Sequence, residues 1–538
     1  MKTRTYEASG ISRVAMISLG LVVLTSTASY MTGYGAPRSV PIIMGLLFFM
    51  LNVMSRFAIQ AIFLFLSGHK SKRKRVAIYG AGSAGIQLAS ALNLTDEYNP
   101  VCFIDAHPNL NGVIVSGLQV HAPDALEALV ASKNLDEIIL AIPSLPNDRR
   151  QEILKRLSRF KCQIKTLPSL VELVKGKELV SSLMTVTPES LLGRDAINLD
   201  LPEVRNTYKD KVVMVTGAGG SIGSELCRQL LKCDVKKLVL YEHSEFALYT
   251  IHQEFYDHET VVAVPILGSV LDENHLKRAL KAEDVQIILH AAAYKHVPLV
   301  EDNEIVGVEN NVLGTFTVAK AAKDLMLERF ILISTDKAVR PTNVMGATKR
   351  VAELLVQNLA ENCDKTLFSM VRFGNVLGSS GSVIPLFKKQ IDEGGPVRLT
   401  HNDVTRFFMT IPEAASLVLL AGSYAEGGDV FVLDMGEPVR IYDLARSMIE
   451  LSGKTVKDTD NPDGDIEIHV TGLRPGEKLY EELLIDDAQI STPHPKILRA
   501  SEVSLSMKDC ETMLGELENG VENPRAFLKK WVAEYSAA

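Results

Sequence analysis

The sequence has little of what marks several classes of protein. Its 538 residues include one Trp and six scattered Cys, with no Cys-x-x-Cys pair and no His–Cys cluster. This pattern argues against a disulfide scaffold and a zinc site, and it is typical of reduced thiols in a cytosolic compartment. Positive charge is not in excess either, because the net charge is −8. We therefore expect no resident metal and no nucleic-acid partner.

Long apolar runs are confined to the N-terminus, at residues 11–34 and 39–66. Each is long enough to cross a hydrocarbon core of about 30 Å. The basic stretch HKSKRKR, residues 69–75, follows the second run and indicates the cytoplasmic side of a membrane. We expect residues 1–70 to form a transmembrane hairpin in the inner membrane, with lipid as a partner. A signal peptide is the alternative for the first run, but no cleavage site followed by a disulfide-rich body is present.

A first nucleotide-binding pattern follows in RVAIYGAGSAGIQLASAL. An apolar strand leads into Gly80, Gly82 and Gly85, and the next strand ends at Asp105. Glycines at this spacing let a backbone approach a pyrophosphate, and the acid can bind a ribose. No acid–base group of residues follows, so we expect residues 71–190 to form a non-catalytic Rossmann-like domain. Whether it binds a nucleotide or is purely structural stays open.

A second and stronger pattern is KVVMVTGAGGSIGSEL, which has the spacing TGxxGxxG. The strand KLVLYE then ends in a carboxylate that can accept both ribose hydroxyls and would repel a 2′-phosphate, so NAD is favoured over NADP. The residues expected to bind the cofactor here are Gly217, Gly220, Ser221, Ile222, Gly223 and Glu242.

Strand-like and helix-like segments alternate beyond this motif. The strand candidates are VVAVPILG, VQIILHAAA, RFILIST and LFSMVRFGNV. Such alternation predicts a doubly wound parallel sheet with ligands at the carboxyl ends of its strands. The expected fold class is therefore α/β, with two Rossmann-like doubly wound domains after a transmembrane helical hairpin.

One side chain is missing from this second unit. In STDKAVRPTNVMGATKR, residues 334–350, Lys349 stands where short-chain dehydrogenases carry a catalytic Lys. The Tyr that normally precedes it by four residues is replaced by Met345. A thioether cannot donate or accept the proton that the tyrosine passes during hydride transfer. The enzyme is therefore either inactive or moves this proton by another route.

A longer set of motifs resembles one family. The motifs are LLGRD, TGAGGSIGSEL, HAAAYKHVP, NNVLGT, STDKAVRPTNVMGATKR, RFGNVLGSSGSVIP, TRFFMT and GLRPGEKLYEELL. They resemble the membrane-anchored nucleotide-sugar 4,6-dehydratases of polysaccharide and glycan biosynthesis, and among these most of all the UDP-N-acetylglucosamine 4,6-dehydratases. Members usually carry four membrane spans, so the N-terminus here is expected to be shortened.

Residues 501–538 are expected to form polar helices without chemistry. The resemblance implies an extended short-chain dehydrogenase domain over residues 191–500. It also implies a reaction. Oxidation at carbon 4 makes the hydrogen on carbon 5 acidic, water leaves across carbons 5 and 6, and the hydride returns to carbon 6. The product would be a UDP-4-keto-6-deoxy-N-acetylhexosamine, and the cofactor NAD would end as it began.

The family assigns roles to the residues around the missing tyrosine. Asp336 is the expected acid for the leaving hydroxyl, and Lys337 the expected base at carbon 5, with a lowered pKa. Thr335 is the candidate relay for the carbon-4 hydroxyl proton, with Lys349 or a water as its sink. Close relatives share Met345, so it does not by itself mark decay. A surface ion pair is the alternative for Asp336 and Lys337.

Further contacts follow from the resemblance. Ala291 and Ala292 would lie against the dinucleotide, and Ser269 with Val270 would replace an aspartate that commonly contacts adenine. Lys349 would bind the nicotinamide ribose. Packing or cofactor contact is favoured over metal binding for His290 and His296. The residues expected to bind substrate are Lys295, Asn375, Arg406 and Arg474, with an ordinary surface position as the alternative for the two arginines.

Two other functions stay open at this point. An epimerase on the same fold would need no acid for a leaving group, and a membrane scaffold built from two nucleotide-binding units would need no catalysis. A homo-oligomer is also expected. The sequence leaves the stereochemistry at carbon 5 undecided.

Overall fold

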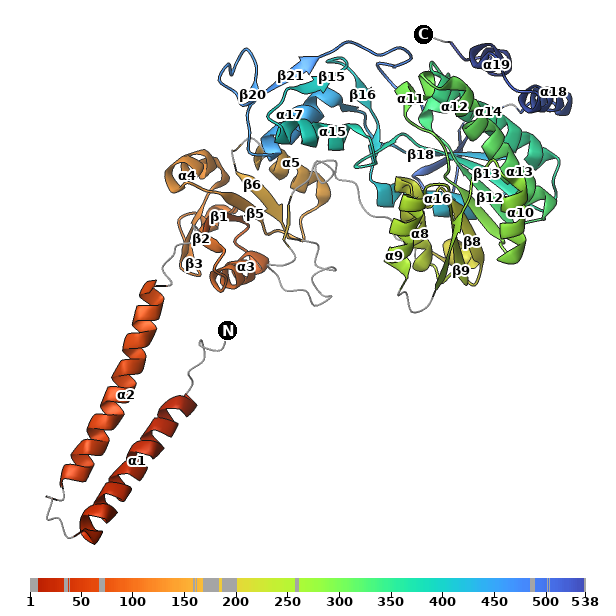
Figure 1. The fold of residues 1–538 in the computed structure, drawn as a ribbon. Coiled ribbons are helices and arrows are strands. Elements are labelled where there is room, and N and C mark those ends of the chain that lie inside the picture. The colour runs from red at the N-terminus through yellow and green to blue at the C-terminus, as the bar shows by residue number, and fades with distance from the viewer. Residues whose placement is uncertain are drawn as a thin grey trace.

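The structure is a computed structural model, and Figure 1 shows a helical hairpin followed by two α/β bodies. It describes residues 8–32, 37, 39–66, 73–157, 160, 162–167, 183–185, 201–256, 261–483, 489–500, 502 and 504–536. The motif LLGRD and the expected boundary between residues 190 and 191 lie outside this part.

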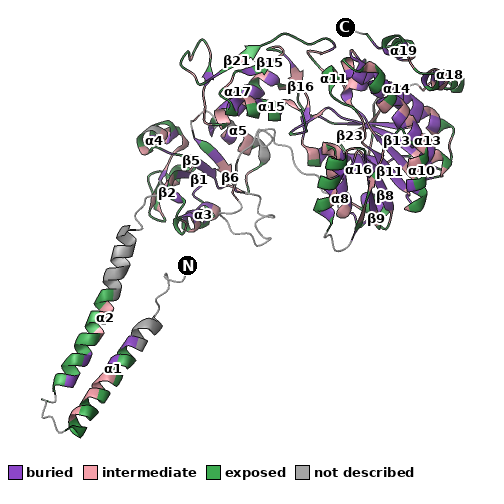
Figure 2. Ribbon diagram, in the orientation of Figure 1, coloured by how far each residue is buried: buried purple, intermediate pink, exposed green. Residues whose placement is uncertain are grey.

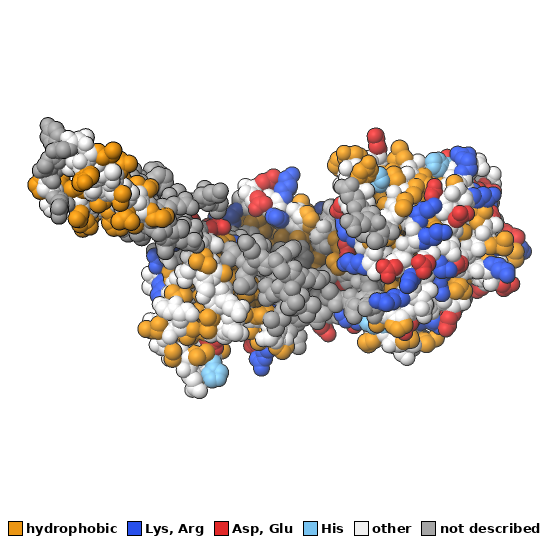
Figure 3. Space-filling view, turned by 90° about the horizontal axis from the view of Figure 1, so that it is seen from below, with side chains coloured by type: hydrophobic (Ala, Val, Ile, Leu, Met, Phe, Trp, Pro, Cys, Tyr) orange, Lys and Arg blue, Asp and Glu red, His pale blue; other side chains and the backbone are white. Residues whose placement is uncertain are grey.

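The N-terminal helices are α1 (Ala8–Met31) and α2 (Ser39–Leu66), which pack against each other. Most of their described side chains are exposed, and apolar groups cover this surface (Figures 2 and 3). Of the described residues, Val14–Met31 is the one stretch whose length and composition suit a membrane crossing, while Ser39–Ser55 is a shorter apolar helix. The two-span hairpin therefore stays a prediction.

The first α/β body contains a sheet with strand order β3-β4-β2-β1-β5-β6-β7. Its central strands β2 (Tyr98–Ile104), β1 (Lys74–Tyr79), β5 (Glu137–Leu140) and β6 (Gln163–Thr166) run parallel. The strands β3 (Ile114–Val115), β4 (Leu118–His121) and β7 (Met184–Thr185) extend the two edges. The helices α3 (Ser83–Asn93), α4 (Leu126–Lys133) and α5 (Asn147–Leu157) complete this body. The Rossmann-like architecture predicted for it is confirmed.

The glycine motif of this first body forms the expected tight turn. Gly80 has a φ of +109°, which favours glycine, and a Cβ on Gly85 would lie 2.0 Å from the Gly80 carbonyl oxygen. The carboxylate of Asp105 accepts a hydrogen bond from the Ala81 amide at 2.8 Å. Strand, glycine turn and acid are thus arranged as in a dinucleotide-binding unit.

The second body is built on a nine-stranded sheet of order β10-β9-β8-β11-β12-β13-β18-β23-β22. The strands predicted from the sequence are confirmed as β8 (Val212–Thr216), β9 (Lys237–Glu242), β10 (Val262–Leu267), β11 (Ile287–His290), β12 (Arg329–Ile333) and β13 (Leu367–Arg372). β18 (Asp429–Leu433) continues the parallel part, and β23 (Ile497–Ala500) and β22 (Gln489–Ser491) add an antiparallel edge. Strands buried on both faces explain the continuous Val, Ile and Leu runs.

Helices cover both faces of this sheet, whose strands are buried in Figure 2. One face packs on α7 (Pro202–Tyr208), α8 (Ser221–Leu231), α9 (Glu245–Phe255) and α16 (Ile411–Ser423). The other packs on α10 (Glu273–Ala282), α13 (Gly314–Asp324) and α14 (Val344–Glu361). This is the doubly wound arrangement that the alternating pattern predicted.

A small lobe stands beside the carboxyl ends of these strands (Figure 1). It contains α15 (Val383–Asp392), α17 (Ile441–Leu451), β15 (Val397–Leu399), β20 (Val456–Lys457) and β21 (Ile466–Val470) around an apolar core of its own. Short strand pairs connect it to the sheet: β14 (Asn375–Val376) with β17 (Phe408–Met409), and β16 (Thr405–Arg406) with β19 (Val439–Arg440). Segments of the lobe thus flank the end of β13.

The C-terminal segment forms α18 (Met507–Glu518) and α19 (Pro524–Trp531). These helices are amphipathic: Met513 and Phe527 share a buried core with Val351 and Leu355 of α14. The sequence suggested polar helices for this segment. In the structure its apolar residues cover the outer face of α14.

Candidate active site

A cavity of about 690 Å³ lies at the carboxyl ends of β8, β11, β12 and β13. The elements that line it are the N-terminus of α8, the chain after β11, the turn after β12, the first turns of α14 and residues 379–382. Among the predicted site residues, the cavity collects Gly220, Ser221, Ile222, Gly223, Ala291, Lys295, Thr335, Lys337, Met345, Lys349 and Asn375. Ligands bind at this edge in open α/β sheets.

Glycines shape one end of the cavity because no other residue fits there. Gly217 has a φ of +66°, and a Cβ on it would lie 2.8 Å from the Cα of Ala292. A Cβ on Gly223 would lie 2.0 Å from the carbonyl oxygen of Gly217. Helix α8 then begins at Ser221 without a side-chain cap on Gly220, which leaves its first amides for an anion.

The carboxylate of Glu242 lies at the end of β9, where it is buried. It accepts hydrogen bonds from the backbone amides of Gly219, His243 and Ser244 at 3.0 to 3.1 Å. These amides fix the carboxylate beside the glycine turn. With the glycine cradle and the free helix end, it makes a set of groups that fits a dinucleotide with an unphosphorylated ribose.

Two predicted adenine contacts lie farther along this edge. The backbone oxygen of Ser269 accepts a hydrogen bond from Tyr241 at 2.9 Å, and its Oγ accepts one from the Leu271 amide at 3.2 Å. Ser269 is exposed and Val270 is buried. Neither is among the residues that line the cavity, so their contact with adenine stays a prediction.

The proton-transfer candidates follow β12, which ends at Ile333. They are therefore not held on opposite sides of a strand, as adjacent strand residues are. The chain then turns into a short 3₁₀ helix, Asp336–Ala338. The Asp336 Oδ1 accepts hydrogen bonds from Thr335 Oγ1 at 2.9 Å and from Lys337 Nζ at 3.0 Å. Lys337 also donates to Asn375 Oδ1 at 3.2 Å. Because the Asp336 side chain is fully buried, this pair is not the surface ion pair considered from the sequence.

The other oxygen of this carboxylate has a different environment. Asp336 Oδ2 is buried and has no hydrogen-bond partner among the described residues. It lies 2.9 Å from the position of a Cβ on Gly374, which explains the glycine in the RFGNV motif. A buried carboxylate oxygen without a partner is unusual in a folded protein, and it can bind a proton or a ligand hydroxyl.

The expected lowering of the Lys337 pKa is wrong. Burial lowers this pKa, but Asp336 and Glu481 together outweigh burial, and the pKa of Lys337 is raised. Of these two carboxylates, the approach of Glu481 to Lys337 was not predicted from the sequence. Lys337 is therefore an ammonium group in this arrangement of side chains.

The pKa of Lys349, in contrast, falls. Burial lowers it to about 8, and the charge of Glu353 opposes the shift. Lys349 lies one helical turn after Met345 on α14, and its Nζ donates to the Ile333 carbonyl at 2.7 Å. The hydroxyl of Thr335 donates its hydrogen bond to Asp336 and not to Lys349. The predicted proton relay from Thr335 to Lys349 is therefore not formed by a direct hydrogen bond in the described structure.

Behind the cavity, buried charges hold these elements together. Glu353 of α14 accepts hydrogen bonds from Ser334 Oγ at 2.6 Å and from Arg372 Nη2 at 2.6 Å. Glu502 pairs with Arg372 and with Arg350 from the other side. No chemistry was predicted for residues after 500, because an isolated Glu carries no signal of burial in the sequence.

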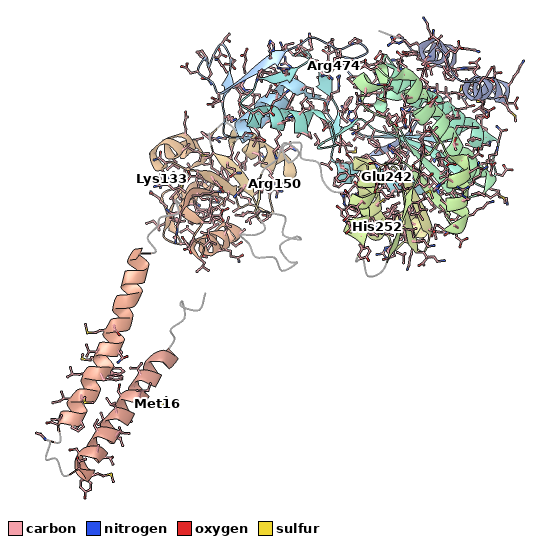
Figure 4. All side chains as sticks on the ribbon, viewed as in Figure 1. Met16, Lys133, Arg150, Glu242, His252 and Arg474 are labelled. Atoms are coloured by element: carbon pink, nitrogen blue, oxygen red, sulfur yellow. The ribbon has the colours of Figure 1, made fainter. Side chains whose placement is uncertain are left out.

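The predicted diphosphate ligands lie apart from the cavity lining. Arg406 pairs with Glu477 at 3.3 Å and Glu481 at 3.6 Å. Arg474 is exposed and lies above the lobe, far from Glu242 in Figure 4. Glu477 braces the turn by accepting from the Arg474 amide at 3.2 Å. Contact of either arginine with a diphosphate therefore stays a prediction.

For His290 and His296 the sequence favoured packing or cofactor contact over metal binding. His290 is fully buried between the hydroxyls of Thr216 and Thr315, at 2.8 and 3.1 Å. Burial lowers the pKa of His290 to about 3, so it is a neutral core residue. His296 lines the cavity, where its ring would block a Cβ on Gly381 at 2.4 Å. His290 therefore has the packing role that was one of the two alternatives for it.

Fold and site together define a class. A doubly wound sheet carries a glycine turn with a carboxylate beside it at the end of the next strand, and Lys349 of α14 lines the cavity at the same edge of the sheet. These features are those of the extended short-chain dehydrogenase fold.

Comparison with known proteins gives the family. The family model for "Polysaccharide biosynthesis protein" matches residues 213–502. "Capsular polysaccharide biosynthesis protein CapD" of Staphylococcus aureus is 45% identical over 421 residues, which cover 77% of this chain and 69% of the relative. The chain belongs to the polysaccharide biosynthesis protein family.

Two further relatives are named as enzymes. "UDP-N-acetylglucosamine 4,6-dehydratase (inverting)" of Campylobacter jejuni is 32% identical over 286 residues, covering 52% of this chain and 79% of the relative. "UDP-glucose 4-epimerase" of Rickettsia bellii is 34% identical over 290 residues, covering 52% and 78%. Similarity to both types makes this chain an enzyme of the nucleotide-sugar dehydratase and epimerase type.

Proposed function

We propose that this enzyme is an NAD-dependent 4,6-dehydratase of UDP-N-acetylglucosamine. The observation that carries the proposal is the Asp336–Lys337 pair, whose lysine lines the same cavity as Lys349. A dehydratase needs two sets of proton-transfer groups, one for oxidation and one for loss of water. The cluster Thr335, Asp336, Lys337 and Lys349 offers enough groups for both.

Oxidation at carbon 4 requires removal of its hydroxyl proton. Met345 cannot take that proton. Lys349 can, because its lowered pKa leaves a large neutral fraction near pH 8. Thr335 would orient the hydroxyl while its own proton stays in the hydrogen bond that Thr335 donates to Asp336. NAD, held by the glycine cradle and Glu242, supplies storage for one hydride between carbon 4 and carbon 6.

Loss of water then needs an acid at carbon 6 and a base at carbon 5. Asp336 has a buried oxygen free to carry a proton to the leaving hydroxyl. Lys337, as a neutral amine, would remove the carbon-5 proton as the electron pair enters an enolate with the carbon-4 ketone. Since the pKa of Lys337 is raised, Lys337 must first lose a proton. Transfer of this proton to Asp336, across their 3.0 Å hydrogen bond, would make both the base and the acid.

The rest of the site would bind the nucleotide part. Asn375, Lys295 and the loop at residues 379–382 line the cavity and would face the sugar and the UDP. Arg406 and Arg474 would reach a diphosphate through their planar guanidinium groups.

We further propose that α1 and α2 form a hairpin in the inner membrane, with both α/β bodies on the cytoplasmic side, and that the enzyme acts as a homo-oligomer.

A product assay tests the function. Purified full-length enzyme is incubated with UDP-N-acetylglucosamine in deuterated water, and the product is analysed by mass spectrometry. We expect a product that has lost one water and gained deuterium at carbon 5. A product of unchanged composition with a new configuration at carbon 4 would favour the epimerase, which the similarity to UDP-glucose 4-epimerase keeps as the second candidate.

The scaffold alternative is tested by Lys337→Ala. General acid–base groups contribute about 10²- to 10⁴-fold, so turnover should fall by about that factor. A low rate that this substitution leaves unchanged would support a scaffold without catalysis.

A further inference from the structure

One wall of the cavity is formed by two short helices, α11 (Val297–Glu301) and α12 (Glu304–Val308). Leu299 of the first helix and Val306 of the second line the cavity, and they are 62% and 47% exposed. Large apolar side chains that face solvent inside a cavity gain free energy when a ligand covers them. These two helices, here called the α11–α12 wall, therefore offer an apolar contact to a bound ligand.

The α11–α12 wall lies beside the part of the cavity where the sugar would react. Val300 of the wall shares a buried core with Val344 and Met345 in the first turn of α14. Val300 and Met345 also line the cavity, as does Lys349 one turn farther along α14. A Cβ on Gly307 would lie 2.6 Å from Val300 Cγ1, so the two wall helices are tightly packed together. Since the carbon-4 hydroxyl must reach Lys349, the sugar would contact this wall, whereas the uridine, beyond the diphosphate, would not.

The α11–α12 wall is tied to the C-terminal helix α19 by one arginine. Arg525 Nη2 donates to Glu301 Oε2 of α11 at 2.7 Å, and Arg525 Nε donates to Glu304 Oε1 of α12 at 2.6 Å. The other oxygen of Glu301 accepts a hydrogen bond from the Val344 amide at 2.6 Å. One guanidinium therefore joins both wall helices, and Glu301 extends the connection to the first turn of α14.

The chain after Arg525 fixes α19 in the same place. Helix α19 packs against α12 and α14 (Figure 1). Beyond the helix, Tyr535 is buried in the core that contains Met345. The Ser536 amide then donates to the carbonyl of Pro341, in the turn that leads into α14, at 3.1 Å. The C-terminal segment, of which no chemistry was expected, thus holds both the wall and this turn.

This support matters because the wall helices are too short to be stable alone. Each has five residues, and isolated helices of that length are marginal in water. A wall released from α19 would populate other arrangements, of which only a part would fit the sugar. The apparent affinity for a ligand falls with the fraction of molecules in the binding-competent arrangement.

We propose that Arg525 is a positioning residue that holds the α11–α12 wall against the sugar of a bound nucleotide sugar. This inference rests on the proposed function for its choice of UDP-N-acetylglucosamine as the ligand. Arg525 is not among the described residues that line the cavity, so it acts through Glu301 and Glu304. It therefore changes the affinity for the sugar part and leaves the chemical steps unchanged.

The binding constants of two nucleotides test the proposal. Full-length enzyme loaded with NADH, which prevents oxidation of the sugar, is titrated calorimetrically with UDP-N-acetylglucosamine and with UDP. For Arg525→Gln we expect the Kd of UDP-N-acetylglucosamine to rise by about 3- to 10-fold, because two partly exposed ion pairs are lost. The Kd of UDP should not change. With NAD and saturating substrate, turnover should stay within about twofold of the parent while KM rises.

Further variants separate this contact from a general effect. Glu304→Gln removes the α12 partner, and adding it to Arg525→Gln should weaken binding little further, because both changes break the same contact. Arg525→Lys keeps the charge without the planar fork and should give an intermediate Kd. The matched control is Lys529→Gln, which removes a positive charge from an exposed position of the same helix. It should bind both nucleotides as the parent does.

Three results would overturn the proposal. They are a parental Kd for UDP-N-acetylglucosamine in Arg525→Gln, an equal rise in the Kd of UDP, and the same selective rise in Lys529→Gln. If Arg525→Gln does not fold, Glu304→Gln takes its place and should show the same selectivity with a smaller rise. A parent enzyme that binds UDP-N-acetylglucosamine but forms no keto product would refute the proposed function, and the binding constants would still decide this inference.

Discussion

At the scale of residues, two lysines of one site have opposite pKa shifts. The pKa of Lys349 is raised by the charge of Glu353 and lowered by burial, and the effect of burial is the larger. Lys337 lies between the carboxylates of Asp336 and Glu481, and their attraction dominates. Near neutral pH, the lysine assigned to carbon 4 can therefore accept a proton, and the lysine assigned to carbon 5 must first lose one.

The pH dependence of oxidation should report Lys349. Below its pKa of about 8 the amine is protonated and cannot accept the carbon-4 hydroxyl proton. The single-turnover rate of nicotinamide reduction should therefore rise with pH through about 8 and level off above it. Lys349→Met should remove this limb together with most of the rate. An oxidation rate in the parent that does not change across this range would exclude Lys349 as the proton acceptor.

A glycine next to Asp336 offers a second prediction. In Gly374→Ala the new Cβ would lie 2.9 Å from Asp336 Oδ2 and 3.2 Å from Met435 Cε. We expect a loss of unfolding free energy of about 1–3 kcal/mol and reduced turnover, because Asp336 must move. Urea denaturation and the product assay measure the two effects.

The control for this variant is Gly515→Ala in α18, where the added Cβ meets no atom within 4 Å. It should stabilise the protein by up to about 1 kcal/mol, because alanine favours a helix over glycine. If Gly374→Ala behaved like this control, the close contact with Asp336 would be excluded.

The sequence predicted the members of the site better than their charges. Thr335, Asp336 and Lys337 follow a long apolar strand, and Met345 and Lys349 share one helix face, so local patterns place all five. Glu481 lies far away in the chain, in a stretch whose pattern resembles any exposed helix start. Its approach to Lys337 depends on how the lobe packs, and so the pKa of Lys337 could not be predicted correctly.

At the scale of elements, a buried ion-pair network joins α14, β13 and the segment after β23. Arg372 is fully buried between Glu353 and Glu502. Glu502→Gln removes one charge from this set, and breaking a buried pair costs about 3–5 kcal/mol. Because Glu353 still pairs with Arg372, we expect the free energy of unfolding, measured by urea denaturation, to fall by about 3 kcal/mol, the lower end of this range. Glu518→Gln at the exposed end of α18 should change stability by less than about 0.5 kcal/mol.

The strength of the sequence pattern decided which elements could be predicted. Strands β8 to β12 are apolar runs of four to six residues, and each is followed by a helix, so their order and parallel pairing follow from general rules. The strands β14 and β16 have two residues each and β22 has three, and each pairs with a segment that is distant in the sequence. Propensity is too weak a guide over such lengths.

At the scale of the whole molecule, the proposed hairpin separates anchoring from catalysis. The hairpin helices are joined to the first body through residues 67–72, which lie outside the described part, and the cavity lies entirely in the second body. Removing residues 1–70 should therefore move the enzyme from the membrane fraction to the soluble fraction. Turnover per molecule should stay within a few-fold. A truncated enzyme that remained with the membrane would contradict the proposed anchor.

The antiparallel edge of the large sheet has a consequence for biosynthesis. β18 finds its neighbour β23 only after residue 500 has been translated, and Glu502 must follow to neutralise Arg372. Domains generally fold as units during translation, beginning at the N-terminus. The apolar helices and the first body can thus mature on the ribosome while the second body waits for its closing strand. With the proposed hairpin in the membrane, a nascent chain stalled before that strand would be anchored yet unable to turn over its substrate.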